Sequence, residues 1–420
     1  MKINTMRKID YYAGGIICRF LLLLRNLYNM IYVFSKPKKN DFKNILIIKF
    51  FGMGSILLAS PALRLIKSKY PCAKVTILTL SENRKLCEML PSIDEVICLS
   101  VNNFFNFVVS FIKTIHNIRK RDIDVIVDLE FLTNFSALVS LLVSLFSKGK
   151  TVVGFNSPLL WRNKVSDINI SFSHNVHVTG IFLKVIHSFG VEEKNLSCEP
   201  EKAALLKHAD MKYMEEVINK NHSIKQCNFF VAVNINAGEL SFHRRWPKEY
   251  FAHVVEKLTE RPDTAVFLIG GKGDVEYVSE FIKTLPYSCR IVNLCGKTTI
   301  EEIIGVLNSC NLLITSDSGP LHFAEVIGLD TISFFGPETP YLYGPVYGNH
   351  HVFYEDVYCS PCLNIYNSKV TNCNNNICLK NIKPEKVLKV IEDNYIRRGE
   401  IKSLRVIFPG ACRPSPTIQY

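Results

Sequence analysis

Short apolar runs rich in β-branched residues alternate with segments of helical periodicity from residue 44 onward. In the first half these runs predict strands at 44–50, 74–80, 94–100, 124–130 and 150–155. In the second half they predict strands at 228–235, 265–271, 290–296, 311–317 and 331–337. Buried strands that alternate with helices are typical of parallel sheets built from βαβ units. The pattern therefore predicts an α/β fold with two Rossmann-like, doubly wound domains in tandem.

The connection between the two sets of strands is charged and lacks strand patterning, and it contains a predicted helix near Lys202–Lys220. The predicted organisation is an amino-terminal segment 1–43, a first domain 44–200, a linker 201–226, a second domain 227–383, and a helix with a tail at 384–420. Two such domains are expected to face each other across a substrate cleft.

Candidate chemistry lies where predicted strands end, because ligands of open α/β sheets bind beyond the carboxyl ends of the strands. After the first strand, Gly52 and Gly54 allow a tight turn and close approach of the backbone to a ligand before a helix begins. Ser55 follows them as a helix cap or a site residue. A glycine turn that only joins strand to helix is the structural alternative.

The first strand of the second domain leads to two adjacent arginines, Arg244 and Arg245, just before a helix that starts at Pro247. The guanidinium group carries a permanent charge and offers bidentate hydrogen bonds to phosphate. The pair is therefore a candidate phosphate-binding site, and a solvated basic pair is the alternative.

A third strand exit combines a small-residue turn with the start of a helix. Its residues are Ser316, Asp317, Ser318, Gly319, Pro320 and, in the first helical turn, His322. Free N–H groups and the helix dipole at such a start favour an anion. The segment predicts a diphosphate site to which His322 adds a donor, although a lone histidine at a helix start can also be structural.

These segments, in this order, resemble glycosyltransferase family 9, the heptosyltransferase family of bacterial envelope glycan synthesis. The resemblance covers about residues 44–383 and rests on GMGSILLASPALR, RRWPKEYF, SDSGPLHFAEVIG, FFGPETPYLYGP and a late cysteine cluster. It implies a GT-B fold, with the nucleotide-sugar donor bound by the carboxyl-terminal domain and the acceptor by the amino-terminal one. It also implies inverting transfer without a catalytic metal, and assigns diphosphate stabilisation to Arg244 and to the helix start at Ser318, Gly319 and His322.

The catalytic base departs from the family pattern. An aspartate commonly follows the glycine of the first loop, but this chain has Ser55 there, and an unassisted serine cannot act as a base near neutral pH. Asp128 and Glu130, at the end of the predicted strand 124–130, are the nearest substitutes. Glu130 is preferred because it is nearer to the strand end, while a base elsewhere, or none, stays open.

Four of the fourteen cysteines form a cluster with the spacing C-x2-C-x10-C-x4-C. They are Cys359, Cys362, Cys373 and Cys378. Four thiolates at such spacing can hold zinc or an iron centre in a structural role. Disulfides and unligated thiols are the alternatives. The other cysteines are scattered singly and behave as small apolar residues.

Charge changes the picture at the two ends of the chain. The 420 residues contain 50 Lys and Arg against 38 Asp and Glu, a net charge of +12. Residues 1–43 hold nine basic and two acidic side chains, a net of +7, and residues 380–420 hold nine and four, a net of +5, so the residues between them are neutral overall. This distribution argues against a basic channel for nucleic acid through the folded middle, and a metal-dependent nucleic-acid binder is the weakest hypothesis.

Residues 11–35 are strongly apolar and contain no charged residue other than Arg19 and Arg25, and Lys36, Lys38 and Lys39 follow at once. Each central arginine costs at least about 2.5 kcal/mol in a membrane span, which argues against a spanning helix. An in-plane amphipathic helix at an anionic membrane surface fits the pattern better. A helix packed on the protein's own surface and a true span are the alternatives. The chain is thus expected to be cytoplasmic and peripheral at the inner face of the cytoplasmic membrane.

The leading hypothesis is a glycosyltransferase that moves a heptose or related sugar from an ADP-heptose-like donor to an envelope glycan or a lipid-linked saccharide. A catalytically silent, sugar-nucleotide-binding or assembly subunit is one alternative, since the usual acid of the first loop is absent. Another GT-B enzyme that uses a UDP-sugar is a second. At the carboxyl end, residues 383–398 predict an amphipathic helix, and the Pro-containing tail after it is expected to be disordered.

Overall fold

The computed structural model describes residues 10–31, 42–100, 104–145, 150–190, 199–238, 242–286, 289–367 and 369–396. The chain divides into two compact units. Unit 1 comprises Met1–His208 with Ile365–Lys369, and unit 2 comprises Ala209–Asn364 with Val370–Tyr420. The predicted tail after residue 398 lies outside the described residues.

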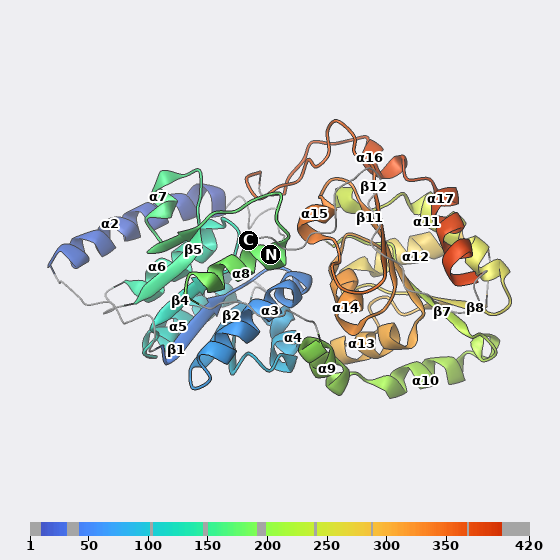
Figure 1. Cartoon of the computed structure of the whole chain (residues 1–420), viewed down its shortest axis with the longest axis horizontal. Helices are drawn as coiled ribbons and strands as arrows, with labels where there is room; N and C mark the ends of the chain where they lie inside the picture. Colours follow the sequence, from blue (N-terminus) through green and yellow to red (C-terminus); the bar gives the residue numbers. More distant parts are fainter. Residues whose placement is uncertain are drawn as a thin grey trace. The chain divides into compact units, whose positions relative to one another are not determined.

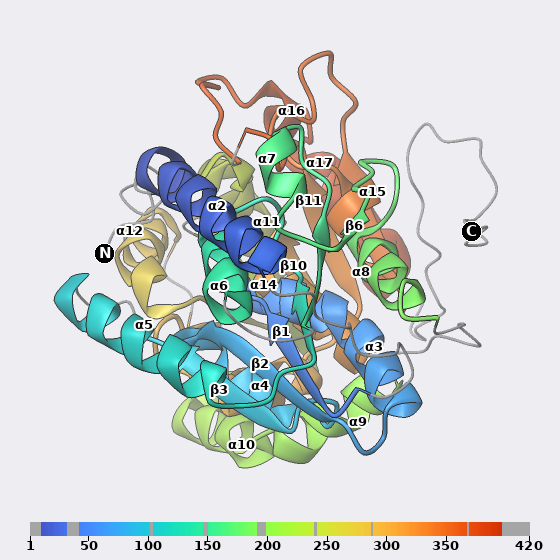
Figure 2. The same cartoon turned by 90° about the vertical axis from the view of Figure 1, so that its left-hand side faces the viewer.

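Unit 1 is built on a parallel six-stranded sheet in the order β3-β2-β1-β4-β5-β6 (Figure 1). Its strands are β1 Asn44–Ile48, β2 Lys74–Leu80, β3 Glu95–Leu99, β4 Val125–Asp128, β5 Thr151–Phe155 and β6 Ile168–Ile170. Its main helices are α3 Met53–Lys69, α4 Arg84–Met89, α5 Phe104–Arg119, α6 Asn134–Ser144, α7 Leu160–Asn163, α8 Val178–His187 and α9 Glu199–His208. Helices α3 and α8 lie on one side of the sheet and α5 and α6 on the other (Figure 2). Both faces are therefore covered, which is why Leu46, Ile47 and Ile48 are all fully buried.

Unit 2 repeats the architecture in the order β12-β11-β10-β7-β8-β9. Its strands are β7 Phe229–Asn234, β8 Thr264–Leu268, β9 Ile291–Asn293, β10 Leu312–Ser316, β11 Thr331–Phe335 and β12 His350–Tyr354. Its main helices are α10 Met211–Lys220, α11 Lys248–Glu260, α12 Val275–Thr284, α13 Ile300–Ser309, α14 Gly319–Ile327, α15 Pro340–Tyr343, α16 Ile377–Lys380 and α17 Pro384–Ile391. The predicted carboxyl-terminal helix corresponds to α17, which packs on α11.

The structure confirms the two parallel α/β sheets and adds one strand at an edge of each. The added strands are β6, which has only three residues, and β12, whose sequence HHVFY begins with two histidines. Neither has the apolar run of a central strand, because an edge strand is less completely covered. The helix predicted near 202–220 is two helices, α9 and α10, and Asp210 caps the second by accepting hydrogen bonds from the N–H groups of Lys212 and Tyr213.

The amino-terminal segment contains a short π-helical turn, η1 Asp10–Gly14, and α2 Gly15–Ile31, which packs on α6 of unit 1. Cys18, Leu21 and Leu22 are buried in this contact, against a cluster that includes Leu141 and Val165. In the described part of the chain no helix is both long and apolar enough to cross a membrane.

Candidate functional site

The first glycine loop follows β1 and turns sharply into α3. Gly52 has a φ of 83°, a left-handed conformation that favours glycine, and its carbonyl accepts the Ile56 N–H at 3.1 Å. Gly54 is buried in the first turn of α3, and Ser55 follows it there, half-buried. The loop thus has the tight turn predicted from its glycines, and Ser55 stands at the helix start.

Glu130 holds the beginning of this loop. Its Oε1 accepts hydrogen bonds from the Phe50 N–H at 2.5 Å, the Phe51 N–H at 2.8 Å and Lys49 Nζ at 3.0 Å. Both partners of the ion pair are buried, with side chains 4% and 5% exposed. Among the described residues, none donates a hydrogen bond to Oε2.

The two carboxylates of the predicted strand 124–130 occupy different environments. The strand ends at Asp128, although the Leu129 N–H still donates to the Ile48 carbonyl at 3.0 Å. Asp128 Oδ1 accepts the Glu130 N–H at 3.0 Å and Oδ2 accepts the Ser136 hydroxyl at 2.7 Å. Asp128 therefore faces α6, whereas Glu130, beyond the strand end, faces the exit of β1.

Arg162 is the cation nearest to Asp128. Its Nη2 lies 4.0 Å from Asp128 Oδ2, and its Nη1 donates to the Thr133 carbonyl at 2.5 Å. Burial raises the pKa of Asp128 to about 6, while Arg162 and the Ser136 hydroxyl oppose that rise. Sequence reasoning missed both Arg162 and Lys49. A lysine directly after the apolar run NILII was a usable signal for Lys49, but nothing in the local pattern marks Arg162.

Asp128 predicts a pH dependence of stability. Because its pKa is raised above the value of about 3.9 for an unfolded aspartate, the native state binds the proton more tightly than the unfolded state. This contribution to stability is complete below about pH 4 and is lost as the pH rises through about 6. Urea denaturation from pH 4 to 7 should show the free energy of unfolding falling more steeply in the wild type than in Asp128→Asn. Parallel curves would contradict the prediction, and Asp122→Asn, at an exposed position, is the control.

In unit 2 the candidate anion site is the start of α14, where β10 ends. Ser318 is the N-cap, and Pro320 stands in the first turn. A Cβ added to Gly319 would meet no atom within 4 Å, so the space beside the helix start is open. Free N–H groups at such an end, with the dipole behind them, can bind an anionic group.

Asn234, at the end of β7, fixes the cap of this helix. Its Nδ2 donates to Ser318 Oγ at 2.8 Å and to Thr315 Oγ1 at 3.1 Å. Ser316 Oγ accepts the Trp246 N–H at 3.1 Å. Hydrogen bonds thus connect the end of β7 and the segment before α11 to the residues that lead from β10 into α14. Asn234 was not among the residues predicted from the sequence.

The two arginines before α11 have different partners. Arg244 Nη1 lies 3.1 Å from Asp317 Oδ2, and Nη2 donates to the Ala237 carbonyl. The structure thus brings Arg244 to the strand exit that also carries the start of α14. Arg245 instead lies over two aromatic rings. Its Cζ is 4.3 Å from the ring centroid of Phe242 and 3.9 Å from that of Tyr277.

His322 is 5% exposed, and its side chain lies beside Glu325, a second buried residue of α14. Its Nδ1 lies 3.6 Å from Glu325 Oε2, and Glu325 Oε1 accepts the N–H groups of Val346, at 2.5 Å, and Tyr347, at 3.1 Å. Burial opposes the Glu325 charge, but His322 and the backbone donors keep the pKa of Glu325 below its usual value. Glu325, which sequence reasoning missed, thereby ties α14 to the loop after α15 and places a carboxylate near His322 Nδ1, which has no hydrogen-bond partner among the described residues.

The four clustered cysteines all belong to unit 2, between β12 and the first residues of α16. Burial raises the pKa of the Cys378 thiol to about 11, and Cys362, Cys373 and Cys359 add to the shift, so the four thiols lie within electrostatic reach of one another. Among the described residues, however, no group of three or more His, Cys, Asp or Glu side chains is arranged to hold a metal ion. The structural zinc or iron centre stays a prediction from the cysteine spacing.

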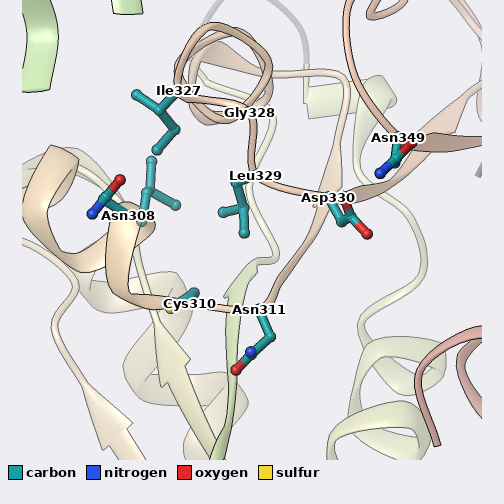
Figure 3. Close-up of a pocket in the computed structure, with 9 residues that line it drawn as sticks. Asn308, Cys310, Asn311, Ile327, Gly328, Leu329, Asp330 and Asn349 are labelled. Atoms are coloured by element: carbon teal, nitrogen blue, oxygen red, sulfur yellow. The ribbon is translucent and has the colours of Figure 1, made fainter. Parts of the chain in front are cut away.

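A cavity of about 340 Å³ lies near the amino ends of the unit 2 strands, at the end of the sheet away from the start of α14 (Figure 3). Its lining includes Asn311, just before β10, Asp330, just before β11, and Asn349, just before β12. These residues stand at the amino ends of the strands, whereas the start of α14 lies at the carboxyl ends. The cavity is therefore separate from the candidate anion site.

Comparison with known proteins agrees with the fold and the strand-exit motifs. The family model for glycosyltransferase family 9 (heptosyltransferase) matches residues 111–371. Lipooligosaccharide heptosyltransferase 2 of Campylobacter jejuni is 32% identical over 152 residues, which are 36% of this chain and 46% of that protein. The chain thus spans about half the length of the two curated Campylobacter jejuni heptosyltransferases that it matches.

Two solved structures share the fold. The glycosyltransferase family 9 protein of Veillonella parvula has a TM-score of 0.64 and 22% identity, and the match covers 86% of this chain and 99% of that one. The ADP-heptose lipopolysaccharide heptosyltransferase II of Escherichia coli has a TM-score of 0.62 and 18% identity over 83% of this chain and 98% of that one. With the GT-B-like fold and a family match across more than half of its length, this chain belongs to glycosyltransferase family 9, the heptosyltransferase family.

Proposed function

We propose that this protein transfers a heptose from an ADP-heptose-like donor to a saccharide of the lipooligosaccharide or lipopolysaccharide core, or to its lipid-linked precursor. The transfer is inverting and needs no catalytic metal. The observation that carries the proposal is the open start of α14, with His322 in its first turn and Arg244 at the same strand exit. Family membership and the names of the relatives support heptose as the sugar.

On the donor side, the departing nucleoside diphosphate develops negative charge that must be stabilised. The N–H groups at the start of α14 and the imidazole of His322 are the proposed donors to it. Arg244 shares its charge with Asp317, but a guanidinium has five N–H donors, so it can also contact a phosphate. The adjacent Arg245, whose guanidinium lies over the rings of Phe242 and Tyr277, is proposed as a further cation for the phosphates.

On the acceptor side, Glu130 is the proposed general base. Three hydrogen bonds to Oε1 fix the carboxylate in one orientation, and Oε2 is available for the hydroxyl proton. Asp128 is the second candidate, and Gly52, Gly54 and Ser55 of the first loop are proposed to contact the acceptor. The reaction is placed at the inner face of the cytoplasmic membrane, in keeping with the basic amino-terminal segment.

A nucleotide panel tests the donor. Thermal unfolding with ADP, UDP, GDP and CMP should show the largest stabilisation by ADP, because a ligand that binds only the folded state raises its stability by RT ln(1 + [L]/Kd). Gly319→Leu should abolish this stabilisation and leave the melting temperature without nucleotide nearly unchanged, since an added Cβ there meets no atom within 4 Å. Stabilisation by UDP alone would favour a UDP-sugar enzyme. Binding of ADP without transfer from ADP-heptose to any core acceptor would favour the silent subunit.

A further inference from the structure

The outward face of α2 is a continuous apolar stripe. Ile16, Phe20, Leu23, Leu27 and Met30 repeat every three or four residues, so they lie along one side of the helix. Their exposed fractions range from 49% to 81%. Exposed apolar surface of this extent marks an interaction site rather than ordinary surface.

Of the two charged residues of α2, Arg25 is half-buried and held against the protein, whereas Arg19 is exposed and lies beside one aromatic ring. Arg25 donates from Nη1 to the Val165 carbonyl at 2.8 Å and from Nη2 to the Lys164 carbonyl, and Arg19 lies 5.6 Å from the ring centroid of Trp161. Both arginines thus contact α7 and the residues just after it. An arginine held by two carbonyls cannot turn outward without losing these bonds, so α2 is fixed with its apolar stripe outward.

Two contacts at the beginning of the segment fix it further. The Asn134 N–H donates to Asp10 Oδ2 at 3.0 Å, and Asn134 Nδ2 donates to the Asp10 carbonyl at 2.9 Å. Asn134 is the first residue of α6, four residues after Glu130. The orientation of α2 is therefore tied to the loop that carries the proposed base.

Further exposed apolar residues lie beside α2. Helix α7 is its neighbour in both views (Figures 1 and 2), and Trp161 of α7 packs against the same cluster as Leu22. At the start of α7, Leu159 and Leu160 are 51% and 80% exposed. The apolar surface is therefore wider than one helix.

Basic residues stand before and after α2 in the sequence. Lys2, Arg7 and Lys8 precede it, Lys36, Lys38, Lys39 and Lys43 follow it, and α2 itself contains no acidic residue. We propose that the outward stripe of α2, together with Leu159 and Leu160, docks unit 1 onto an anionic lipid bilayer, with the helix in the plane of the headgroups. This inference deepens the proposed function by naming the membrane-binding surface, and it rests on that function only for the choice of leaflet.

A second copy of the chain fits this surface less well. The three-four spacing resembles a coiled-coil seam, but pairing two copies would bring their basic flanks together without acidic partners. Anionic headgroups supply the missing negative charge instead. Charge complementarity therefore selects the lipid surface.

Vesicle sedimentation of the full chain tests the proposal. The protein should bind vesicles of phosphatidylethanolamine with about one third phosphatidylglycerol, and bind neutral phosphatidylcholine vesicles much less, because the basic flanks need anionic lipid. The double variant Phe20→Asp, Leu23→Asp should lower the partition coefficient at least about tenfold, since both side chains leave the apolar phase. Both positions are more than half exposed, so the variant is expected to fold.

The matched control is Ile112→Asp, whose side chain is 62% exposed. Its helix, α5, lies on the other side of α6 from α2 (Figure 2). This variant should bind vesicles like the wild type. Equal loss in this control, unchanged binding of the double variant, or a dimer in light scattering that the double variant abolishes would each overturn the proposal. Stabilisation by ADP, measured on the same variants, separates membrane docking from the proposed transfer activity. Vesicle binding does not depend on whether transfer occurs.

Discussion

Replacing Glu130 with glutamine is expected to lower kcat for sugar transfer at least about tenfold, because a general base typically contributes about 10²–10⁴-fold to the rate. The amide oxygen can still accept from Phe50, Phe51 and Lys49, so the loop after β1 stays anchored. The amide nitrogen replaces the oxygen that would take the proton. Steady-state kinetics with ADP-heptose, together with ADP binding by calorimetry, should show the loss in kcat with nearly unchanged nucleotide affinity.

A comparison of two further variants separates proton transfer from positioning. Lys49→Met removes the ion pair and keeps the carboxylate, so it should lose stability but retain more activity than Glu130→Gln. Glu130→Asp keeps a carboxylate on a shorter side chain and should restore part of the rate. Full activity of Glu130→Gln would reject this base, and equal loss in Lys49→Met would assign Glu130 a positioning role.

Replacing Trp246 with alanine is expected to reduce the free energy of unfolding of unit 2 by about 3–5 kcal/mol. The side chain is fully buried, its ring stacks on Phe334 with centroids 4.1 Å apart, and its Nε1 donates to the Ile382 carbonyl at 2.9 Å. Alanine would leave a cavity in the hydrophobic core of unit 2 and remove the donor to the Ile382 carbonyl. Trp246→Phe keeps the stacking and should lose less.

The two tryptophans make this experiment selective, because Trp161 belongs to unit 1 and Trp246 to unit 2. In urea denaturation of Trp246→Ala, the remaining fluorescence reports Trp161, while circular dichroism reports both units. Circular dichroism should show a transition at lower urea concentration that is absent from the Trp161 fluorescence. Stabilisation by ADP should also weaken. A single unshifted transition in both signals would contradict the expected loss.

Much of the fold could be predicted because central strands of parallel sheets are buried on both faces. The run KVTILTL coincides with β2, and NILII with β1, since a strand covered by helices needs an unbroken apolar sequence. The glycine turn at Gly52 and the helix start at Gly319 were also predictable, because both depend on local backbone geometry. The edge strand β12 was missed because its sequence does not carry that pattern.

The environments of the charged site residues could not be predicted in the same way. Glu130 and Lys49 are 81 positions apart, and Arg162 is 26 positions from Ser136, so their meeting depends on strand order and helix placement. In a continuous strand Asp128 and Glu130 would point to the same face, but the strand ends at Asp128 and the two side chains separate.

The amino-terminal helix also combines features that the sequence predicts with features that only tertiary contacts decide. The sequence by itself determined that residues 15–31 form an amphipathic helix with basic flanks, because periodicity and charge are local properties. Which side turns outward was decided only by the tertiary structure, where the carbonyls of Lys164 and Val165 hold Arg25 against unit 1. The net charge of +12 and the two parallel sheets could be predicted from the sequence. The partner of each buried charge was not, because it is set by contacts between residues far apart in sequence.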